Sequence, residues 1–569
     1  MNGKTRPSPD FLIAMAILAV FGNALFCLFT LDDYRHLVDN PAIRNPGEAL
    51  KAFLTSTYPG NLYRPLVTLS HWLVYSFSKL HPFWHHLLNV ILHMGVCLLI
   101  YRLALRLVAG KSALLLALLF AVNPLRVEAV TSISGRAELL CSLFGLLGVM
   151  FFSKMVEVTA VAKYRGGLAS GLFLCFFCAL LSKESALVFL LLMPLYAIYA
   201  GKGLPSWPAI KGAAVPVAAA LLVYLLLRVS VLGNLLGPSG TIDFLDNPLI
   251  GVPAAERFVN ALALLGRYVF ISLVPLHLSA DYSFAVLKPL PLWLSPEAWV
   301  WMYFLALMIF LALRRIRSFD AVSFFALWFL LGFAVTSNVL FPIGTIFAER
   351  LSYLPGIGLA GLLAVALREV SGMPLRRVLI AFFLIFFAAR SALQNEVWRD
   401  NYSLHTYQYG ISPQSAKTLL NYGVVLRESG ALDKSTGLFE RALAVYPAFA
   451  DASYNLGINS LNLRREDEAR SWLDKTLKLN PSHPPALNLS GRIALRRGEL
   501  NIARGYFERA AKIDRYDFKA RIGLLAVAIA GRQLPEARAL VGVLKVISPE
   551  HPDLRRLEQY LKKEEAAGT

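Results

Sequence analysis

Charged residues are scarce in this sequence, and their scarcity excludes an ordinary soluble protein for most of the chain. Only 16% of the 569 residues are Asp, Glu, Lys or Arg, whereas 56% are hydrophobic and the mean hydropathy is +0.55. A typical soluble domain carries about 25% charged residues. Basic residues outnumber acidic ones and give a net charge of +19. Many lie in short loops between apolar runs, which is typical of membrane orientation signals rather than of a nucleic-acid surface.

Cysteine is also rare, and its placement excludes a disulfide framework. All five cysteines lie inside apolar runs, and the C-x-x-C formed by Cys175 and Cys178 has no second pair with which to build a zinc site. His86, Asn89 and His93 are spaced to share one helix face, but no carboxylate at helical spacing completes a metal-binding set. We therefore do not predict a metal site, although a divalent ion bound by acidic residues is possible. We expect the histidines to form hydrogen bonds.

Long apolar runs, by contrast, are abundant before residue 391. Eleven of them are near membrane-crossing length: 11–30, 84–101, 112–124, 138–153, 167–181, 185–201, 212–232, 298–313, 320–337, 351–367 and 377–391. Basic clusters in alternate loops place the N-terminus inside and the C-terminal part outside. The apolar segment 257–276 breaks this alternation, so we expect it to be re-entrant or interfacial, or else to cross together with an unrecognised partner.

Glycine and proline recur at a fixed interval after these runs. Gly423, Gly457 and Gly491 are 34 residues apart, and so are Pro447 and Pro481. This period predicts tetratricopeptide repeats, each a pair of packed helices. The chain is therefore predicted to be all-α, with four parts: a membrane-embedded core at 1–391, a linker at 392–415, four repeats at 416–551, and a capping helix and tail at 552–569.

Two adjacent carboxylates, Asp32 and Asp33, follow the first apolar run directly. On the predicted outer face, one of them can take a proton from a hydroxyl nucleophile, because adjacent carboxylates raise each other's pKa and a positioned base assists such attacks. A solvated helix end is the alternative explanation for this pair.

Acidic and basic residues also occur together at three predicted outer helix ends. These are Arg136 with Glu138, Lys183 with Glu184, and Arg350 with Glu349. Taken singly, each could be a local ion pair that offsets burial. Three on one face favour a site for an anionic ligand, since arginine and lysine suit phosphate oxygens.

Several motifs occur in an order that resembles a known family. They are Leu31-Asp32-Asp33 with Asp39-Asn40, Tyr63-Arg64-Pro65, His86-Leu87-Leu88-Asn89 with His93, Glu128-Ala129-Val130, Gly135-Arg136-Ala137-Glu138, Lys183-Glu184, Asp246-Asn247-Pro248, Ser337-Asn338 and Ala348-Glu349-Arg350. Together with the repeats, they resemble the transmembrane and tetratricopeptide-repeat-containing O-mannosyltransferases over essentially the whole chain.

This resemblance implies a GT-C glycosyltransferase fold and an inverting transfer of a mannose-like hexose from a polyprenyl-phosphate donor to a protein hydroxyl. It implies that Asp32 and Asp33 are catalytic, one of them as the base. The candidates for donor-phosphate binding are Arg64, Arg136, Lys183 and Arg350. The supporting pocket residues are Tyr63, His86, Asn89, His93, Glu128, Glu138, Glu184 and Glu349.

The same resemblance implies the partners and the location. The partners are the lipid-linked sugar, in which the lipid is undecaprenyl or dolichyl phosphate, an acceptor polypeptide held by the repeats, and membrane lipids, with no nucleic acid. The compact chain with short loops favours a bacterial inner membrane with a cytoplasmic N-terminus and periplasmic repeats, or an endoplasmic-reticulum membrane with luminal repeats in a eukaryote.

Some observations keep other functions open. Asn123 and Arg126 stand where the animal proteins usually have histidines, so the preference for sugar or lipid can differ. A non-catalytic membrane adaptor would explain the repeats but not the polar outer loops. A lipid or solute transporter would be expected to show internal symmetry in the core, and none is visible.

Overall fold

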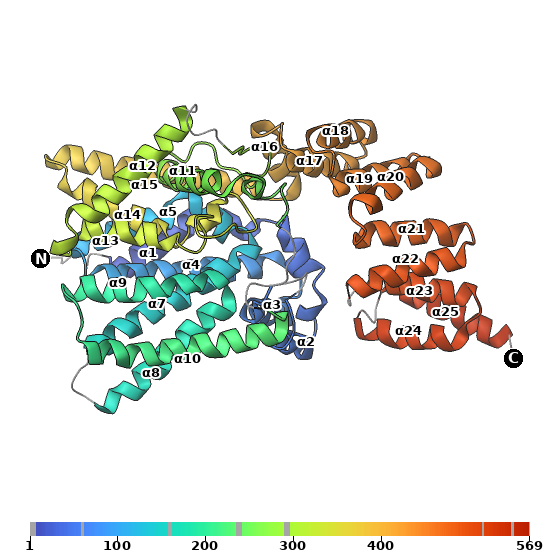
Figure 1. Ribbon diagram of the computed structural model, residues 1–569, viewed down its shortest axis with the longest axis horizontal. Coiled ribbons are helices and arrows are strands. Elements are labelled where there is room, and N and C mark those ends of the chain that lie inside the picture. The colour runs from blue at the N-terminus through green and yellow to red at the C-terminus, as the bar shows by residue number, and fades with distance from the viewer. Residues whose placement is uncertain are drawn as a thin grey trace, which may run out of the picture. The chain divides into compact units, whose positions relative to one another are not determined.

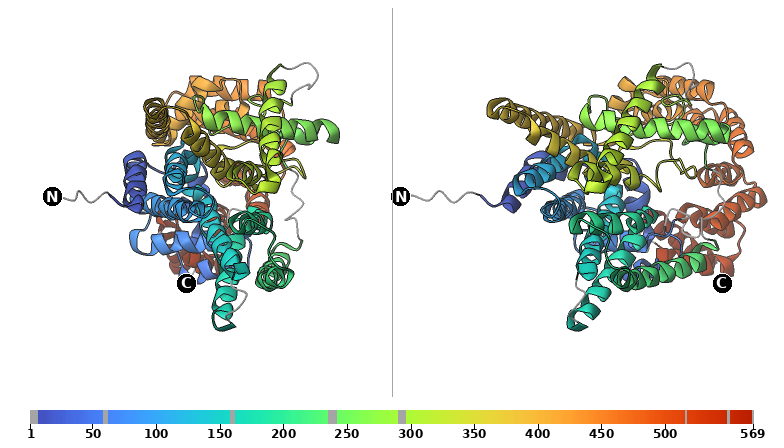
Figure 2. Two further views of the ribbon diagram at one scale, coloured as in Figure 1. Left: turned by 90° about the vertical axis from the view of Figure 1, so that its left-hand side faces the viewer. Right: turned by 60° about the vertical axis from the view of Figure 1, so that its left-hand side comes forward.

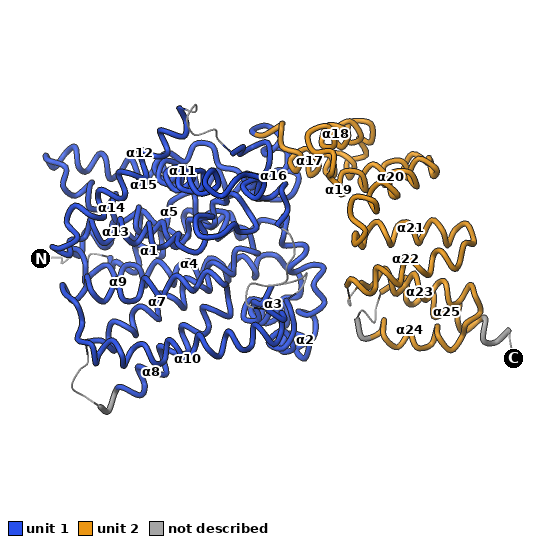
Figure 3. Tube along the Cα trace, in the orientation of Figure 1, with its two compact units in different colours: residues 1–411 blue, residues 412–569 orange. Residues whose placement is uncertain are grey.

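The structure is a computed structural model that describes residues 7–57, 62–157, 162–234, 242–289, 296–514, 517–547 and 551–567. Over these ranges the regular secondary structure is helical, and the only β-structure is one isolated bridge between Thr57 and Leu62. The chain divides into two compact units, Met1–Ile411 and Ser412–Thr569 (Figure 3). The predicted all-α fold is confirmed.

The first unit contains sixteen of the described α-helices (Figure 1). They are α1 Pro9–Phe21, α2 Pro46–Lys51, α3 Pro65–Ser78, α4 Pro82–Ala104, α5 Gly110–Val122, α6 Val127–Val130, α7 Arg136–Glu157, α8 Ala162–Ser182, α9 Phe189–Gly201, α10 Trp207–Leu232, α11 Ala254–Leu273, α12 Pro296–Arg314, α13 Ala321–Gly332, α14 Gly356–Glu369, α15 Met373–Val397 and α16 Asn401–Ile411. Proline occupies the first helical position of α1 to α4, where its missing N–H is not needed.

Seven helices in the described part of the chain are long and apolar enough to cross a membrane. They are Pro82–Ala104, Ile133–Glu157, Arg165–Ser182, Glu184–Gly201, Trp207–Leu232, Pro296–Arg314 and Met373–Val397. The pair Gly110–Val122 and Pro124–Val130, bent by 58°, makes an eighth if it forms one broken span. All eleven predicted spans overlap observed helices. A membrane location is confirmed, while the number of crossings and the sidedness remain predictions.

Close helix packing in this unit depends on residues without bulky side chains. Helices α7, α8 and α10, coloured teal to green, lie side by side in Figures 1 and 2. Helix α11, which contains most of the segment 257–276, packs against α12 at Gly266, where an added Cβ would lie 1.7 Å from the Trp301 carbonyl oxygen. Only glycine permits this backbone approach.

The second unit is built from repeated helix pairs. The helices are α17 Ala416–Glu428, α18 Leu432–Val445, α19 Ala450–Asn462, α20 Glu466–Leu479, α21 Pro484–Arg496, α22 Leu500–Ile513, α23 Phe518–Ala530, α24 Leu534–Ile547 and α25 Pro552–Ala567. Within the pairs, Phe439 packs over Gly423 and Phe507 over Gly491. The four predicted repeats coincide with the four pairs from α17 to α24, and α25 follows where the capping helix was predicted.

The segment predicted as a linker is largely helical and is bonded to the first unit. Helix α15 continues to Val397, and α16 belongs to the first unit. The amide of Leu28 donates to the Arg399 carbonyl (2.7 Å), and that of Leu31 donates to Asn401 Oδ1 (3.0 Å). The backbone that precedes the acidic pair is therefore held by the residues between α15 and α16.

Candidate active site

Asp33 is a buried carboxylate whose oxygens accept hydrogen bonds from two chain segments. Oδ1 accepts from the Ser134 amide (2.7 Å) and Oδ2 from the Thr30 amide (3.1 Å), with longer bonds from the Ser132 and Thr30 hydroxyls (both 3.4 Å). Burial raises the pKa of Asp33 to about 6, even though the hydrogen bonds from the Thr30 and Ser134 amides lower it. Asp33 therefore joins the acidic loop to the loop before α7.

Asp32 is the opposite case, because its side chain is exposed. The chain turns sharply here: Leu31 adopts a positive φ of 45°, and a single π-helical turn, Tyr34–Val38, follows. The half-buried His36 shows which groups lie around Asp32. Burial lowers the pKa of His36, Asp32 raises it, and Arg64 and Arg350 lower it. His36 therefore lies within electrostatic range of Asp32, Arg64 and Arg350, and Asp32 lies within range of Arg350.

Three of the four cations of the predicted site are paired with carboxylates from other segments, which corrects the local-pair explanation. Arg64 donates to Glu184 Oε2 from Nε (3.1 Å) and Nη2 (2.8 Å). The remaining partners are Lys183 with Glu138 and Arg350 with Glu128. The neighbouring residues predicted to form local pairs do not bond to each other, because the helix ends bring each cation against a different segment.

Arg350 is the most exposed of these cations. Its side chain is 40% exposed, whereas that of Glu128 is 4% exposed. Glu128 Oε2 also accepts from the Arg350 amide (2.7 Å). Glu128 raises the pKa of Arg350, burial lowers it, and Asp32 and Glu138 raise it further. Arg350 is thus a fixed cation with an open side toward the acidic pair.

Arg136 has a different environment from the other predicted phosphate ligands. It is fully buried, and its donors go to neutral acceptors: Nε to Asn89 Oδ1 (2.9 Å), Nη2 to the His85 carbonyl (2.7 Å) and Nη1 to His71 Nδ1 (2.9 Å). The Asn89 amide nitrogen donates to the carbonyls of Val130 (3.2 Å) and Ser132 (3.0 Å). Arg136 therefore links α3 and α4, and through Asn89 it also contacts the loop that carries the Ser132 and Ser134 donors to Asp33.

The other predicted pocket residues are buried and mostly hydrogen-bonded. His93 Nε2 donates to the Ala121 carbonyl (3.2 Å), so its Nδ1 accepts from the Tyr353 hydroxyl (2.6 Å). The Tyr63 hydroxyl donates to the Phe53 carbonyl (3.0 Å). His86 is 1% exposed, and neither ring nitrogen has a partner among the described residues.

Glu349 bonds the loop that carries Ser279 and Tyr282 rather than pairing with Arg350. Its Oε1 accepts from the Ser279 amide (2.6 Å) and from the Tyr282 hydroxyl (2.7 Å). Burial raises the pKa of Glu349 to about 8, and Glu128 adds to this rise. The motif residue Asn247 has a similar role, since its amide donates to Asn338 Oδ1 (2.9 Å) and the Ile343 carbonyl (2.7 Å). These two residues therefore hold loops from separate parts of the first unit together.

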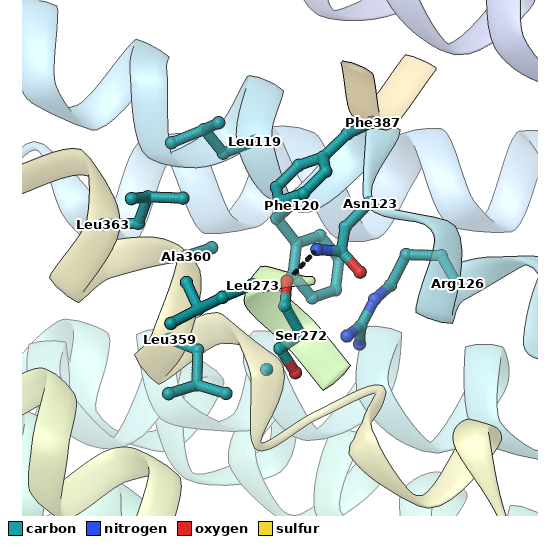
Figure 4. A pocket seen from close by; sticks show the side chains of 11 residues that line it. Leu119, Phe120, Asn123, Arg126, Ser272, Leu273, Leu359, Ala360, Leu363 and Phe387 are labelled. Carbon is teal, nitrogen blue, oxygen red and sulfur yellow. Dashed lines mark hydrogen bonds between the residues drawn. The ribbon is translucent and has the colours of Figure 1, made fainter. Parts of the chain in front are cut away.

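Two cavities lie close to these groups. The first, of about 430 Å³, is lined by His36, Arg64, Thr68, His71 and Ser134, among others. The second, of about 310 Å³, is shown in Figure 4; leucine and phenylalanine side chains from α5, α11, α14 and α15 line most of it.

Most of the polar groups that line the second cavity are hydrogen-bonded within the protein, although Arg126 Nε has no partner among the described residues. Asn123 Nδ2 donates to the Ser272 carbonyl (3.0 Å), as Figure 4 shows. Arg126 Nη1 donates to the carbonyls of Ser352 and Tyr353 (both 2.7 Å). Arg126 thereby fixes the turn Glu349–Ser352 that carries Arg350. Among the residues that the structure describes, no group of three or more His, Cys, Asp or Glu side chains could hold a metal ion.

Similar proteins support the sequence resemblance. The mouse (Mus musculus) protein O-mannosyl-transferase TMTC3 is 26% identical over 525 residues, which cover 85% of this chain and 56% of that protein. The Drosophila melanogaster protein O-mannosyl-transferase Tmtc3 is 26% identical over 573 residues, which cover 87% of this chain and 61% of that protein. This chain is related to the transmembrane and tetratricopeptide-repeat-containing O-mannosyltransferases. It spans little more than half the length of these curated relatives.

The repeats are matched separately. The tetratricopeptide repeat family model matches residues 420–484. The solved tetratricopeptide repeat protein YrrB, described as having an unusual peptide-binding site, is 17% identical with a TM-score of 0.24, and the match covers 28% of this chain and 88% of that one. The family model confirms the predicted class of repeat.

The sequence pattern did not identify three residues of this region. His36, His71 and Arg228 lie among the predicted residues in the structure, with Arg228 3.5 Å from Glu184. Arg228 lies deep in an apolar run, where an arginine is costly and usually functional or paired. That signal could have identified it, whereas nothing in the local sequence distinguishes His36 or His71.

Proposed function

We propose that this protein is an integral-membrane glycosyltransferase. It moves a hexose from a polyprenyl-phosphate donor to a hydroxyl of a protein, with inversion, and its repeats engage the acceptor polypeptide. The observation that carries the proposal is the exposed Asp32 within electrostatic range of Arg350, with His36 within range of both and of Arg64. The relatives' names, which describe protein O-mannosyl-transferases, support the reaction class.

The two aspartates have different roles in this proposal. Asp32 is the general base, because its carboxylate is exposed to an incoming hydroxyl. Asp33 is a positioning residue, because its oxygens are occupied by the donors of Thr30, Ser132 and Ser134. The Asp32 carboxylate removes the acceptor proton as the hydroxyl oxygen attacks the anomeric carbon, and the polyprenyl phosphate departs with the bonding electrons.

The departing phosphate gains negative charge as its bond to the sugar breaks. Fixed cations aimed at that charge stabilise the transition state. Arg350, with its open side, is assigned to this phosphate, together with Arg64 and Lys183. Arg136 supports the site from beneath, since its donors already bond neutral groups.

The repeats supply the acceptor. Tethering an acceptor polypeptide to the same chain raises its effective concentration near the catalytic groups. The donor is undecaprenyl- or dolichyl-linked according to whether the membrane is a bacterial inner membrane or that of the endoplasmic reticulum. In both settings the repeats lie on the non-cytoplasmic side.

Asparagine variants of the two aspartates test this division of labour. Asp32→Asn should reduce the transfer rate by about 10²–10⁴ without changing the unfolding temperature, because the side chain is exposed. Asp33→Asn should lower both the transfer rate and the unfolding temperature, because an amide nitrogen would face the donors of Thr30 or Ser134. Transfer is measured with purified protein, a polyprenyl-phosphate mannose and an acceptor polypeptide. Glu48→Gln, a partly buried carboxylate paired with Lys51 (2.6 Å) and remote in sequence from the acidic pair, is the control. Full activity of Asp32→Asn would refute the proposed base.

A further inference from the structure

The hydrogen bonds around His71 determine which of its ring nitrogens carries the proton. His71 lies on α3 and is 2% exposed, and its Nδ1 is 2.9 Å from Arg136 Nη1. A guanidinium group has donors only, so Nδ1 must accept this bond. Burial and the charge of Arg136 lower the pKa of His71 well below its ordinary value. The ring is therefore neutral at physiological pH, and its single proton is on Nε2.

This Nε2–H donor has no hydrogen-bond partner among the described residues. A buried donor without an acceptor is costly, by about 1–3 kcal/mol, and is rare in folded proteins. His71 is also one of the side chains that line the 430 Å³ cavity. A ligand oxygen entering that cavity would satisfy the donor.

The cavity lies directly beside the acidic pair. Ser134, which lines it, donates its amide to Asp33 Oδ1 (2.7 Å). His36, which also lines it, follows Asp32 by four residues. A ligand in the cavity would therefore be next to the proposed base.

The residues that line the cavity also indicate which ligand would bind. No carboxylate lines it, so it does not select a cation. The hydrogen-bonding groups in the lining are the His71 donor, the Thr68 hydroxyl and the Asn40 amide. Arg64 also lines the cavity and donates a hydrogen bond to Glu184. Neutral donors beside a phosphate-binding cation suit a hydroxyl-rich group attached to a phosphate.

We infer that this cavity receives the hexose ring of the lipid-linked donor and that His71 Nε2–H donates a hydrogen bond to one of the sugar hydroxyl oxygens. The identity of the ligand rests on the proposed function. His71 is then a sugar-binding residue, and Arg136, which holds its ring, is a positioning residue.

His71→Asn isolates the donor, because the asparagine Oδ1 takes the place of Nδ1 as the acceptor for Arg136 while the Nε2–H is removed. Binding is measured on the purified full-length protein in detergent with two probes: a short-chain polyprenyl-phosphate mannose and the same polyprenyl phosphate without sugar. His71→Asn should bind the mannose-bearing probe roughly three- to tenfold more weakly, as expected for one lost neutral hydrogen bond. Its affinity for the bare phosphate should be unchanged.

A second variant and a control keep the test decisive. Thr68→Val keeps the shape of a second lining residue and removes its hydroxyl, so it should show the same selective loss, and it replaces His71→Asn if that variant does not fold. His405→Asn changes another buried histidine, on α16 and outside the cavity lining, and should bind both probes as the parent does.

The outcomes separate this inference from the proposed function. Equal affinity of the parent for the two probes, or an equal change in affinity for both in the variants, would overturn the sugar site. If no transfer is found but the preference for the mannose-bearing probe depends on His71, the sugar site stands and the proposed function fails. If transfer occurs and both variants keep the parent's preference for the mannose-bearing probe, the proposed function is supported and the sugar site is refuted.

Discussion

The membrane core and the repeats use polar contacts in different ways. In the core, the contacts of the candidate site join residues far apart in the chain: Arg64 and Glu184 are 120 residues apart, and Arg350 and Glu128 are 222 apart. In the repeats, the contacts join neighbouring pairs of helices: Arg504 and Glu536 are 32 residues apart. The repeats can therefore be stabilised pair by pair, whereas the site forms only when most of the core is folded.

Burial follows the same division. The side chains of Lys183 and Glu138 are 11% and 10% exposed, whereas those of Arg504 and Glu536 are 25% and 38% exposed. An unpaired charge is much more costly in the first environment than in the second, because water cannot replace the lost partner. The same kind of substitution should therefore have very different effects in the two units.

The largest difference is expected from removing one member of each ion pair. Lys183→Met leaves Glu138 buried without its partner and should lower the free energy of unfolding by roughly 3 kcal/mol. Arg504→Met should cost less than about 1 kcal/mol. Denaturant unfolding of the detergent-solubilised protein measures both. The double variant Lys183→Met/Glu138→Leu should recover most of the core loss, and equal costs for the two single variants would contradict the comparison.

Helix packing in the core should be the next most sensitive feature. Gly266→Ala would place a Cβ against the Trp301 carbonyl and force α11 away from α12, so we expect a loss of about 1–3 kcal/mol in unfolding free energy. Thermal unfolding checks this. Gly167→Ala, in helix α8, is the control, because no atom lies within 4 Å of an added Cβ there. A Gly266→Ala protein as stable as this control would show that the two helices can separate without cost.

The acidic loop should give the core a pH dependence that the repeats lack. The folded state holds the Asp33 proton more tightly than the unfolded state, since the pKa of Asp33 is raised to about 6. Its contribution to stability is therefore present at low pH and is lost as pH rises through about 6. The destabilisation caused by Asp33→Asn should be larger at about pH 5 than at about pH 7.5, by about 1 kcal/mol.

The smallest effect should be a gain in the repeats. Gly505 lies inside α22, is exposed, and has no atom within 4 Å of an added Cβ. Gly505→Ala should stabilise the protein by about 0.4–1 kcal/mol, because alanine loses less backbone entropy in a helix. A rise in the unfolding temperature of the repeats would be the readout. A fall in the unfolding temperature would mean that the added methyl group meets other atoms on this surface of α22.

Some parts of the fold were predictable because their cause is local. The repeats follow from residues such as Gly423 and Phe439, which meet within one pair of helices. The helices of the core follow from their apolar runs. The number of membrane crossings is harder to predict, since α13 and α14 have only 12 and 14 residues and packing, rather than length, decides their position.

The candidate site was predictable in its residue types but not in its connections. Lys183 bonds Glu138 rather than its neighbour Glu184, because the end of α8 faces the start of α7. Asp32 and Asp33 are adjacent, yet one is exposed and the other is buried, because Leu31 turns the backbone. His71 carries no signal in the local sequence. These distinctions depend on contacts between distant segments, which a single sequence does not contain.

The segment after α15 decides where the two units can be cut apart. A chain ending at Val397 would lose the Arg399 carbonyl and the Asn401 side chain, which accept from the amides of Leu28 and Leu31. The acidic loop would then lose two of its anchors, and a loss of activity in such a fragment would be mistaken for a requirement for the repeats. A cut after Ile411 leaves both anchors in place and would report what the repeats themselves contribute.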